Sequence, residues 1–368
     1  MKLEIVTNAI AAISRQGYAR ELPDFSLLKV CIMKTIPHLK RRKLVASLAC
    51  AAAALVSPFI AGHAAAQAAY PSKPITMVVS YPAGGDSDSL ARLYAEKLTA
   101  KLGQNVIVEN RPGASGTIGN AFVAKAPADG YTLLFTPNTI SIATLVLKPG
   151  SGAAYDALND FTPIIQACNQ SLFMVSSVSS GLTNVKGVVE AAKANKLKGY
   201  GSPGSGSPMH ILGELFNSAA GVKIQQIPYR GSAPSVIDLL GGQIPFIYTT
   251  IGSVQQHVAS GKLAVVAVAD AQRTPLLPNV PTIAEAGFKD VNVGAWQGLM
   301  GPKNLPADIV KTLNTAMNDI LKMPDVISRM TTLGGIAVGG EPAVLARSNI
   351  ADHTRYAKVI KEFGIQAD

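Results

Sequence analysis

The side chains that carry most enzyme chemistry are few in this chain and do not cluster. Beyond residue 68 the histidines are His210, His257 and His353, without the spacing of paired metal ligands or an H-E-x-x-H motif. No serine stands in a Gly-x-Ser-x-Gly elbow, which disfavours an α/β-hydrolase nucleophile. Asp86 and Asp88 form a close acidic pair that could do acid–base work, but helix capping explains Asp88 more simply. The sequence therefore predicts a protein that is not an enzyme and binds no metal.

Two glycine-rich segments resemble nucleotide-binding loops but lack their defining residues. Gly113–Gly119 spaces its first glycines as G-x-x-G rather than G-x-G, so it fails the dinucleotide pattern. Gly201–Ser207 lacks the Gly-Lys-Ser/Thr ending of a phosphate-binding loop. Cys168 is the one cysteine beyond residue 68, and a single cysteine forms neither an internal disulfide nor a metal cluster. We therefore expect no cofactor.

Loops rich in Gly, Ser and Thr follow several predicted strands. In an open parallel sheet the ligand crevice lies at the carboxyl ends of the strands. Backbone N–H groups at a helix N-terminus are unpaired and carry partial positive charge, so they suit an anionic group. Ordinary turns and caps explain any one such loop, but several at one sheet edge favour a shared anion site. The loops are Pro82–Asp88, Thr136–Thr139, Gly201–Ser207, Tyr229–Ser232 and Thr249–Gly252.

These loops must be positioned by strands and helices that alternate from Lys73 onward. The alternation predicts an α/β fold with parallel-type sheets flanked by helices on both faces. We expect strands at Ile75–Tyr81, Asn105–Glu109, Tyr131–Phe135, Leu172–Ser176, Lys198–Tyr200, Lys223–Pro228, Pro245–Tyr248, Leu263–Ala269 and Ala295–Met300. We expect one helix from an N-cap at Ser87 or Asp88 to Gly103, and others at Val185–Ala194, Pro208–Ala219, Ala233–Leu240, Ala307–Leu321 and Pro342–Glu362.

The net charge of +10 belongs mostly to the first 68 residues, which hold nine cations and three anions. The rest of the chain is close to neutral and has no basic cluster, so nucleic acid is not an expected partner. Lys40–Lys43, the apolar run Leu44–Ala61 and the A-x-A triplet Ala66–Ala68 follow the order of a secretory signal peptide. The sequence therefore predicts export, with cleavage before Ala69.

Residues 33–68 make a signal peptide of ordinary size if the chain starts at Met33 rather than Met1. Residues 1–32 are then an over-extended start. A membrane anchor is the alternative, but the apolar run is mostly alanine and contains Pro58. Ser47–Cys50 also matches a lipoprotein box weakly.

Several motifs occur in order beyond the leader: Pro74–Val79, Ala83–Arg92, Val108–Gly113, Ala128–Leu133, Pro228–Pro234, Val280–Gly287 and Trp296. In these motifs the chain resembles the Bug family, the periplasmic solute receptors of tripartite tricarboxylate transporters. The resemblance implies a two-lobed periplasmic-binding-protein fold of type II, with two sheets and a hinge. It places residues 69–172 and 291–368 in one domain and residues 173–290 in the other.

The resemblance also implies a function. We expect a monomeric extracytoplasmic receptor in the periplasm that captures a small organic carboxylate in the cleft between its domains. It would deliver this ligand to the membrane subunits of a tripartite tricarboxylate-type transporter. A sensory receptor without a transporter and an α/β enzyme acting on an anionic substrate stay open as alternatives.

The ligand loops of the family can be carried onto this sequence position by position. Backbone amides are then expected to grip the carboxylate, and Arg230 is either a clamp for it or a solvated side chain. His210 is either a ligand contact or an ordinary helix-face histidine. The implied ligand-binding residues are Tyr81, Ala83, Gly84, Gly85, Asp88, Thr136, Asn138, Thr139, Ser202, Gly204, Ser205, Gly206, Ser207, His210, Tyr229, Arg230, Gly231 and Thr249.

The sequence departs from the family pattern at positions that bear on the ligand. Thr249 occupies a position that is frequently Asp in relatives, and Pro245 also replaces an acidic residue. Because an Asp at position 249 could pair with an ammonium group, its loss favours a carboxylate without one. Asp86 replaces a residue that is commonly neutral, and its charge would weaken anion binding unless the side chain faces solvent.

Overall fold

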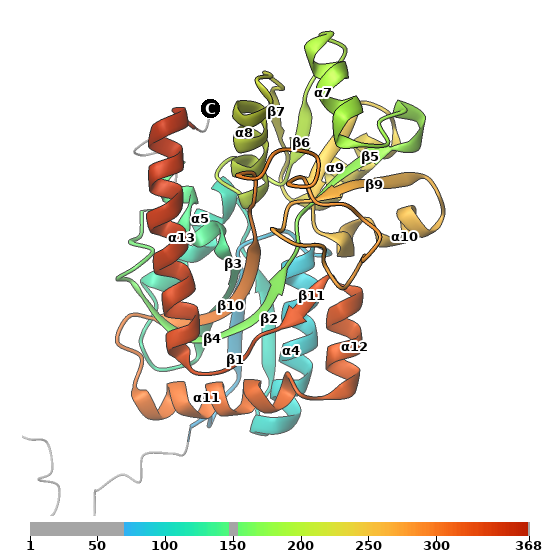
Figure 1. Ribbon diagram of the computed structural model, residues 1–368. Coiled ribbons are helices and arrows are strands. Elements are labelled where there is room, and N and C mark those ends of the chain that lie inside the picture. Colours follow the sequence, from blue (N-terminus) through green and yellow to red (C-terminus); the bar gives the residue numbers. More distant parts are fainter. Residues whose placement is uncertain (1–69, 147–153, 367–368) are drawn as a thin grey trace, which may run out of the picture. The chain divides into compact units, whose positions relative to one another are not determined.

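The computed structural model describes residues 70–146 and 154–366. The predicted leader, its cleavage site and both candidate start residues lie outside the described residues. Within the described ranges, no helix is long and apolar enough to cross a bilayer. These residues build two mixed sheets, each flanked by helices (Figure 1).

The first sheet has six strands in the order β11-β4-β10-β3-β1-β2. They are β1 (Ile75–Val79), β2 (Val106–Asn110), β3 (Thr132–Pro137), β4 (Phe161–Gln170), β10 (Ala295–Pro302) and β11 (Gly335–Ala337). Strand β1 pairs in parallel with β2 and β3, whereas β10 runs antiparallel to β3 and β4, and β11 runs antiparallel to β4.

The second sheet has five strands in the order β7-β6-β8-β5-β9. They are β5 (Phe173–Ser177), β6 (Tyr200–Ser202), β7 (Gln226–Pro228), β8 (Phe246–Thr249) and β9 (Leu263–Val268). Strand β6 is parallel to β7 and β8, and β5 is antiparallel to β8 and β9. Parallel pairing, which the sequence predicts throughout, therefore holds only around β1 and β6. The strands next to the chain crossings between the sheets, β4, β5, β9 and β10, make the antiparallel pairs.

The helices connect these strands. They are α4 (Asp86–Leu102), α5 (Thr117–Ala124), α6 (Ala143–Val146), α7 (Val185–Lys193), α8 (Pro208–Ala220), α9 (Ser232–Leu240), α10 (Gln255–Ala259), α11 (Ala307–Ile320), α12 (Pro324–Thr332) and α13 (Pro342–Phe363). Short 3₁₀ turns are η1 (Ala114–Gly116), η2 (Asn138–Ser141), η3 (Val178–Ser180) and η4 (Ile251–Ser253). The N-cap of α4 is Gly85, so the prediction of Ser87 or Asp88 as the cap is wrong by two to three residues.

Alternate residues of β1 face opposite sides of the first sheet, as the pleat of a strand requires. Ile75 and Met77 pack with α4, α11 and α12 on one face. Val78 packs with α5 and with Leu345 of α13 on the other face. All three β1 side chains are fully buried, and burial of each such side chain stabilises the fold by roughly 1.5–3 kcal/mol. The sheet is thus held rigidly between two helical layers.

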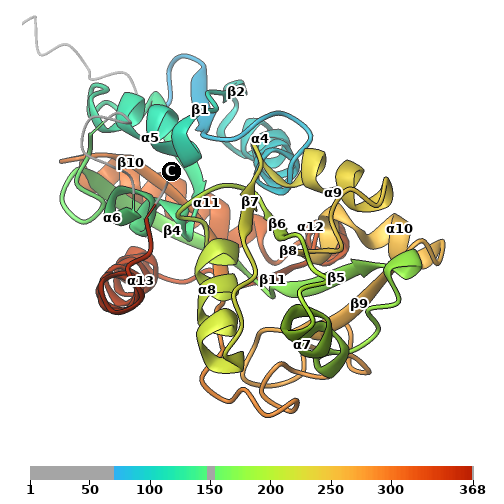
Figure 2. The same cartoon turned by 90° about the horizontal axis from the view of Figure 1, so that it is seen from above.

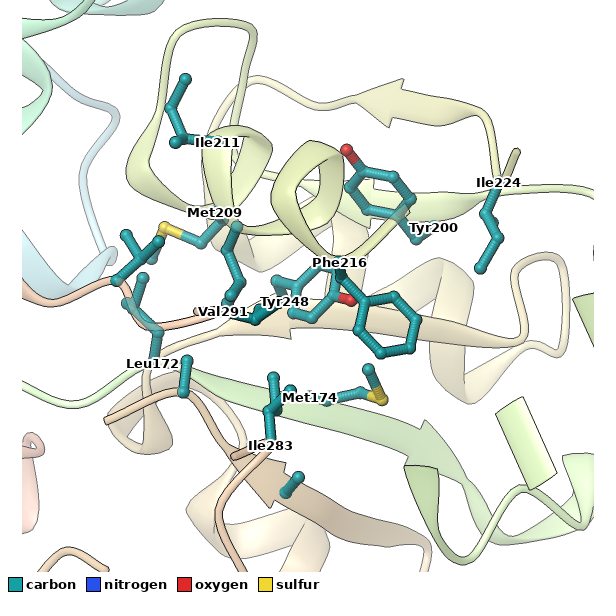
Figure 3. Packing of buried hydrophobic residues seen from close by; sticks show 14 of the residues in the cluster. Leu172, Met174, Tyr200, Met209, Ile211, Phe216, Ile224, Tyr248, Ile283 and Val291 are labelled. Carbon is teal, nitrogen blue, oxygen red and sulfur yellow. The ribbon is translucent and has the colours of Figure 1, made fainter. Parts of the chain in front are cut away.

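The second sheet has the same two-sided construction. Met174 of β5 and Tyr248 of β8 pack with Phe216 of α8 in one buried cluster (Figure 3). Phe173 and Val175, the neighbours of Met174, face the opposite cluster with residues of α9. The loops Gly201–Ser207 and Thr249–Gly252, which follow β6 and β8, therefore start from a sheet that is packed on both faces and is held in place.

The chain crosses between the sheets at two places that lie near the predicted domain boundaries. It passes from β4 to β5 through Ser171 and Leu172, and it returns from β9 to β10 through residues 269–294. The long helix α13 adds a third link, because Leu345 packs on the first sheet while Tyr356 and Ile360 join the core of the second. Figure 2 shows α13 nearly end-on, beside α6 and α8. The division into two domains at residues 172 and 290 stays a prediction.

Candidate ligand-binding site

A pocket with a volume of about 90 Å³ lies where the carboxyl ends of strands from both sheets meet. This is the sheet edge at which open α/β folds bind ligands. By the measure that one water needs ~10–15 Å³, it has room for several waters or one small molecule. Its lining residues are Tyr81, Pro82, Ala83, Gly85, Asp86, Ser87, Pro137, Asn138, Thr139, Gln170, Pro203, Pro208, Met209, Arg230, Gly231, Ser232, Ala233, Pro234, Thr250, Ala295 and Gln297.

The N-termini of two longer helices open onto this pocket without a side-chain cap. Helix α4 begins after Gly85, and α9 begins after Gly231, which has a φ of +100°. A glycine adopts this φ without strain, whereas other residues rarely do. The first N–H groups of each helix have no partner within the helix and carry partial positive charge. Both helix starts therefore offer donors to an anionic or strongly polar group in the pocket.

Helix α8 also starts at the pocket, but its first turn is already capped. The Ser207 hydroxyl accepts the His210 N–H at 3.2 Å, and the Gly206 N–H donates to Nδ1 of His210 at 3.1 Å. Pro208, the first residue of the helix, lacks an N–H altogether. This helix contributes its Pro208 and Met209 side chains to the wall of the pocket more than it contributes donors.

Arg230 supplies the positive charge among the lining residues. Its side chain is exposed, and in the part of the chain that the structure describes it makes no hydrogen bond or ion pair. The guanidinium carries five donors in a planar fork that matches a carboxylate. An unpaired arginine beside two uncapped helix starts makes one side of this pocket electropositive.

Asp86 is the acidic residue of the pocket lining, and it is half-buried rather than solvated. The Thr250 hydroxyl donates a hydrogen bond to its carboxylate. Burial raises the pKa of Asp86 to about 6, and the hydrogen bond from Thr250 lowers it only in part. Since Asp86 starts α4 beside the first sheet and Thr250 follows β8 of the second, this bond also links the two sheets.

A row of buried amide side chains runs along the floor of the pocket. Ser87 donates to Oε1 of Gln297 at 3.1 Å, and Nε2 of Gln297 donates to Oε1 of Gln170 at 3.0 Å. Gln170 in turn donates to the carbonyl of Leu333 at 3.3 Å. Sequence reasoning missed Gln170 and Gln297 as site residues, and it placed Ser87 within a ligand loop without naming it as a ligand contact. The available signal was a glutamine within an otherwise apolar strand, Gln297 of β10.

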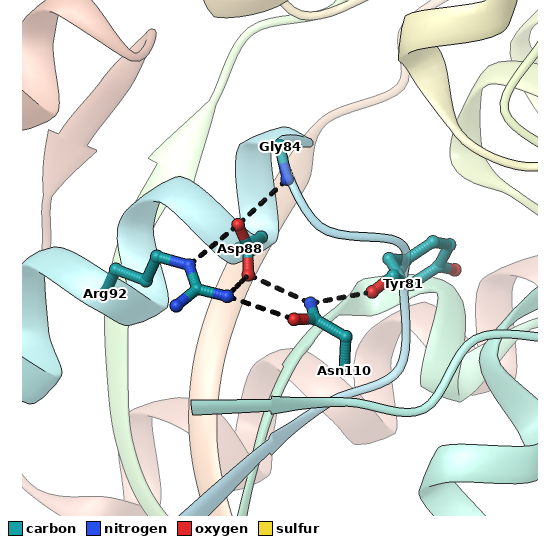
Figure 4. Close-up of polar contacts among 5 residues, drawn as sticks. All are labelled: Tyr81, Gly84, Asp88, Arg92 and Asn110. Carbon is teal, nitrogen blue, oxygen red and sulfur yellow. Dashed lines mark hydrogen bonds and ion pairs between the residues drawn. The ribbon is translucent and has the colours of Figure 1, made fainter. Parts of the chain in front are cut away.

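Asp88 is not among the lining residues of the pocket. Figure 4 shows that it instead bonds to the first loop and to its neighbours. Its carboxylate accepts the Gly84 N–H at 2.9 Å, Nδ2 of Asn110 at 2.9 Å, and Nε of Arg92 at 3.0 Å. Asn110 also donates to the carbonyl of Tyr81 at 3.0 Å. The Gly84 amide is thus already used within the loop, and Asp88 fixes the loop's shape.

The structure brings seven of the predicted ligand-binding residues to the pocket: Tyr81, Ala83, Gly85, Asn138, Thr139, Arg230 and Gly231. The other eleven are not among its lining residues: Gly84, Asp88, Thr136, Ser202, Gly204, Ser205, Gly206, Ser207, His210, Tyr229 and Thr249. Several of these use their polar groups within the protein. Ser202 accepts from Gln226, Tyr229 donates to Asp238, and Thr249 bonds to Ser253. Ligand contact remains a prediction for all eighteen residues.

Residues 90–365 match the model of a family described as the tripartite tricarboxylate transporter family receptor. The chain belongs to this family. It is 33% identical to the structure of periplasmic binding protein BugD, covering 81% of this chain and 100% of that one with a TM-score of 0.76. The predicted Bug resemblance and the two-lobed periplasmic-binding-protein class are therefore confirmed.

Two further family structures contain a bound acid. One is Rpa4515 of R. palustris with adipate, at 32% identity and a TM-score of 0.76, covering 81% of this chain and 99% of that one. The other is MatC from Rhodopseudomonas palustris with bound malate, at 29% identity and a TM-score of 0.74, covering 79% of this chain and all of that one.

Proposed function

We propose that this family member is a solute-binding receptor that captures a small carboxylate in the pocket and delivers it to a tripartite tricarboxylate-type transporter. The observation that carries the proposal is that one cavity is lined by two helix N-termini without a side-chain cap and by Arg230, whose guanidinium is unpaired. The adipate and malate bound by two relatives support the same ligand class. A single carboxylate can accept hydrogen bonds from all three donor groups.

The available donors are sufficient for tight binding. Micromolar affinity requires about 8 kcal/mol, and hydrogen bonds to a charged group contribute roughly 1.5–3 kcal/mol each. Four or five such bonds, from main-chain amides and Arg230, can supply this after the cost of ordering the ligand. The prolines in the lining restrict the loops and so reduce the further cost of ordering these loops on binding.

Ligand binding is proposed to stabilise the arrangement in which the two sheets approach each other. The pocket takes walls from both sheets, and the Thr250–Asp86 bond joins them directly. A ligand that contacts both walls binds this arrangement better than an open one, so it shifts the population toward closure. A transporter can then distinguish the loaded receptor from the empty one.

Location and partners follow the same proposal. The family consists of periplasmic binding proteins, and we propose export by the predicted signal peptide at residues 33–68. The membrane subunits of a transporter are the proposed partners, a sensor is the alternative, and the receptor is proposed to act as a monomer.

An enzyme on the same scaffold is the second candidate, because Asp86 has the pKa of a general base in the pocket. The lining residues include no histidine, cysteine or lysine to act with it. We propose that the ligand is released unchanged. Mass spectrometry of the acid recovered after incubation with the protein tests this, since conversion of the acid would favour the enzyme.

A thermal-shift screen of mono-, di- and tricarboxylic acids is expected to identify at least one acid that raises the melting temperature. At a concentration 100 times its Kd, an acid that binds only the folded state adds about 2.7 kcal/mol to the free energy of unfolding. The corresponding alcohols and amides, which have the same carbon chains without the charge, serve as controls. Equal shifts from acids and amides, or no shift from any acid, would contradict the proposal.

The affinity for such an acid is expected to fall as pH rises from 5 to 8. Because the pKa of Asp86 is about 6, this carboxyl gains its charge in that interval and then repels an anionic ligand. Asp86→Asn should flatten the pH profile and strengthen binding at pH 8 about ten-fold, which corresponds to about 1.4 kcal/mol. Calorimetric titration at each pH, with acids whose own pKa values lie below 5, measures the profile.

Asp270→Asn is the matched control for this profile. Asp270 is likewise a carboxyl whose pKa is raised by burial and that accepts a serine hydroxyl, but it does not line the pocket. Removal of the Asp270 carboxylate should leave the dependence of ligand affinity on pH unchanged. An Asp86→Asn variant that keeps the slope would show that another group controls it.

A further inference from the structure

The two lobes of the protein, one built on each sheet, meet backbone to backbone at η4, the turn that follows β8. A Cβ atom added to Gly252 of η4 would lie 2.6 Å from the carbonyl oxygen of Leu333 and 2.9 Å from its carbonyl carbon. Ordinary van der Waals contacts of a Cβ atom begin at 3.4 Å. Leu333 is the C-cap of α12, beside the first sheet, so a side chain at position 252 does not fit between the lobes in this arrangement.

A second glycine lies on the opposite side of the same contact. A Cβ atom added to Gly334 would lie 2.8 Å from Cγ2 of Ile251, and the φ of +79° at Gly334 also favours glycine. Ile251 is buried in a cluster of the second sheet, whereas Leu333 packs against a cluster of the first. Because such cores are close-packed, an added methyl group would separate the two lobes rather than displace either residue within its own lobe.

This contact is connected to two sides of the ligand pocket. Thr250, two residues before Gly252, lines the pocket and donates a hydrogen bond to Asp86. The Leu333 carbonyl that Gly252 approaches also accepts the side chain of Gln170, a lining residue, at 3.3 Å. Separation of η4 from Leu333 would therefore move Thr250 away from Asp86 and widen the pocket. Gly252 itself is not a lining residue.

We propose that Gly252 is a positioning residue for ligand capture, because the absence of a side chain there lets the lobes close far enough for Thr250 to reach Asp86. This inference rests on the proposed receptor function and assigns control of closure to a residue outside the pocket. A ligand that needs the closed arrangement binds with an apparent Kd that rises as the population of this arrangement falls.

Gly252→Ala is expected to raise the Kd for a bound acid about ten-fold, because the added methyl group makes the closed arrangement less populated. The rise should appear mainly in the dissociation rate. The φ of Gly252 lies outside the left-handed region, so alanine adopts this backbone without strain and restricts the unfolded chain. The melting temperature of the ligand-free variant should therefore not fall. Calorimetric titration and stopped-flow kinetics with malate, adipate and citrate as probe acids measure both effects.

Gly187→Ala is the matched control. Gly187 lies on α7 of the second lobe and also has an ordinary φ. A Cβ atom added to it would lie 3.6 Å from Oδ1 of Asn184, which is an ordinary contact within the same lobe. The Kd of this variant should stay within about two-fold of the original, because closure is not obstructed.

Spin labels on the two lobes test whether the change in affinity comes from closure. Glu190→Cys on α7 and Thr315→Cys on α11 provide exposed labelling sites on the second and first lobes. Cys168, the one cysteine beyond residue 68, is buried and does not compete for the label. A saturating acid should shorten the distance between the labels in the original protein, and shorten it less in the Gly252→Ala variant at equal occupancy.

A Kd of Gly252→Ala within about two-fold of the original, or an undiminished change in label distance, would overturn the inference while leaving the receptor function standing. A lower melting temperature of the ligand-free variant would overturn it as well, because the contact would then persist without ligand and have a merely structural role. If none of the probe acids binds the original protein, the proposed function itself fails and this inference fails with it.

Discussion

Arg230→Gln is expected to raise the Kd for the bound acid about 100-fold. Arg230 lines the pocket and carries its positive charge, and its guanidinium has no partner within the described residues, so its hydrogen-bonding capacity is available to a ligand. A paired, charge-assisted contact from arginine to carboxylate contributes roughly twice as much as a neutral hydrogen bond. Loss of the contact corresponds to about 2.7 kcal/mol of binding free energy, which isothermal titration calorimetry measures directly.

The stability of the Arg230→Gln protein should be unchanged, because no intramolecular contact is lost. Arg230→Lys keeps the charge without the planar fork, and it should raise the Kd by about ten-fold. Arg273→Gln is the matched control, since Arg273 forms a surface ion pair with Glu285 away from the pocket. A Kd within three-fold of the original for Arg230→Gln would show that Arg230 is a solvated side chain.

Asp88→Ala is expected to reduce the free energy of unfolding by about 2 kcal/mol. Removing one member of a buried charged pair can cost 3–5 kcal/mol, and the estimate is lower here because half of the Arg92 side chain stays in water. The substitution also leaves the Gly84 N–H and the Asn110 side-chain amide without the carboxylate to which they donate. Because the entropy of unfolding grows with chain length, the melting temperature of a protein of this size should fall by about 3 °C in calorimetry.

The contribution of Asp88 also depends on pH in a defined direction. Burial alone would raise its pKa, but the bonds from Arg92, Gly84 and Asn110 outweigh that effect, so the pKa lies below its usual value of 3.8. The stabilisation is therefore complete above pH 4 and is lost as pH falls through the lowered pKa. Asp325→Ala removes an exposed acid from the first turn of α12, where it pairs with Lys97, and should change stability little. Equal losses for both variants would contradict the role of Asp88.

The sequence predicts the class of fold and the edge of the sheets at which the pocket forms, because both follow from strand–helix alternation. It does not predict β4. Pro163 and the polar residues Gln166, Asn169 and Gln170 interrupt the pattern expected of a buried strand. In the structure, β4 pairs on both sides, and its amide side chains bond to one another and to β10. Gln170 was missed as a pocket residue because its strand was missed.

The loop at Gly201–Ser207 shows a different limit of sequence reasoning. Its composition is that of a ligand loop, yet Ser202 bonds to Gln226 and Ser207 caps α8. A hydroxyl that serves its own backbone and one that faces a ligand look the same in a sequence. The same ambiguity applies to Asp88 and Asp86, which are two residues apart in the first turn of α4. Asp88 bonds to Arg92, whereas Asp86 lines the pocket. The two differ only in their positions around the helix axis.

The two-sheet packing of α13 has a mechanical consequence. An α-helix resists bending, and this one is anchored at Leu345 to the first hydrophobic core and at Tyr356 and Ile360 to the second. It therefore acts as a stiff connection between the two sheets, beside the crossings from β4 to β5 and from β9 to β10. Any rotation of one lobe relative to the other must therefore pivot about α13 or displace its last turns from the second core. The amplitude of domain opening is thus limited by the C-terminal helix, which is separate in sequence from the ligand-binding loops.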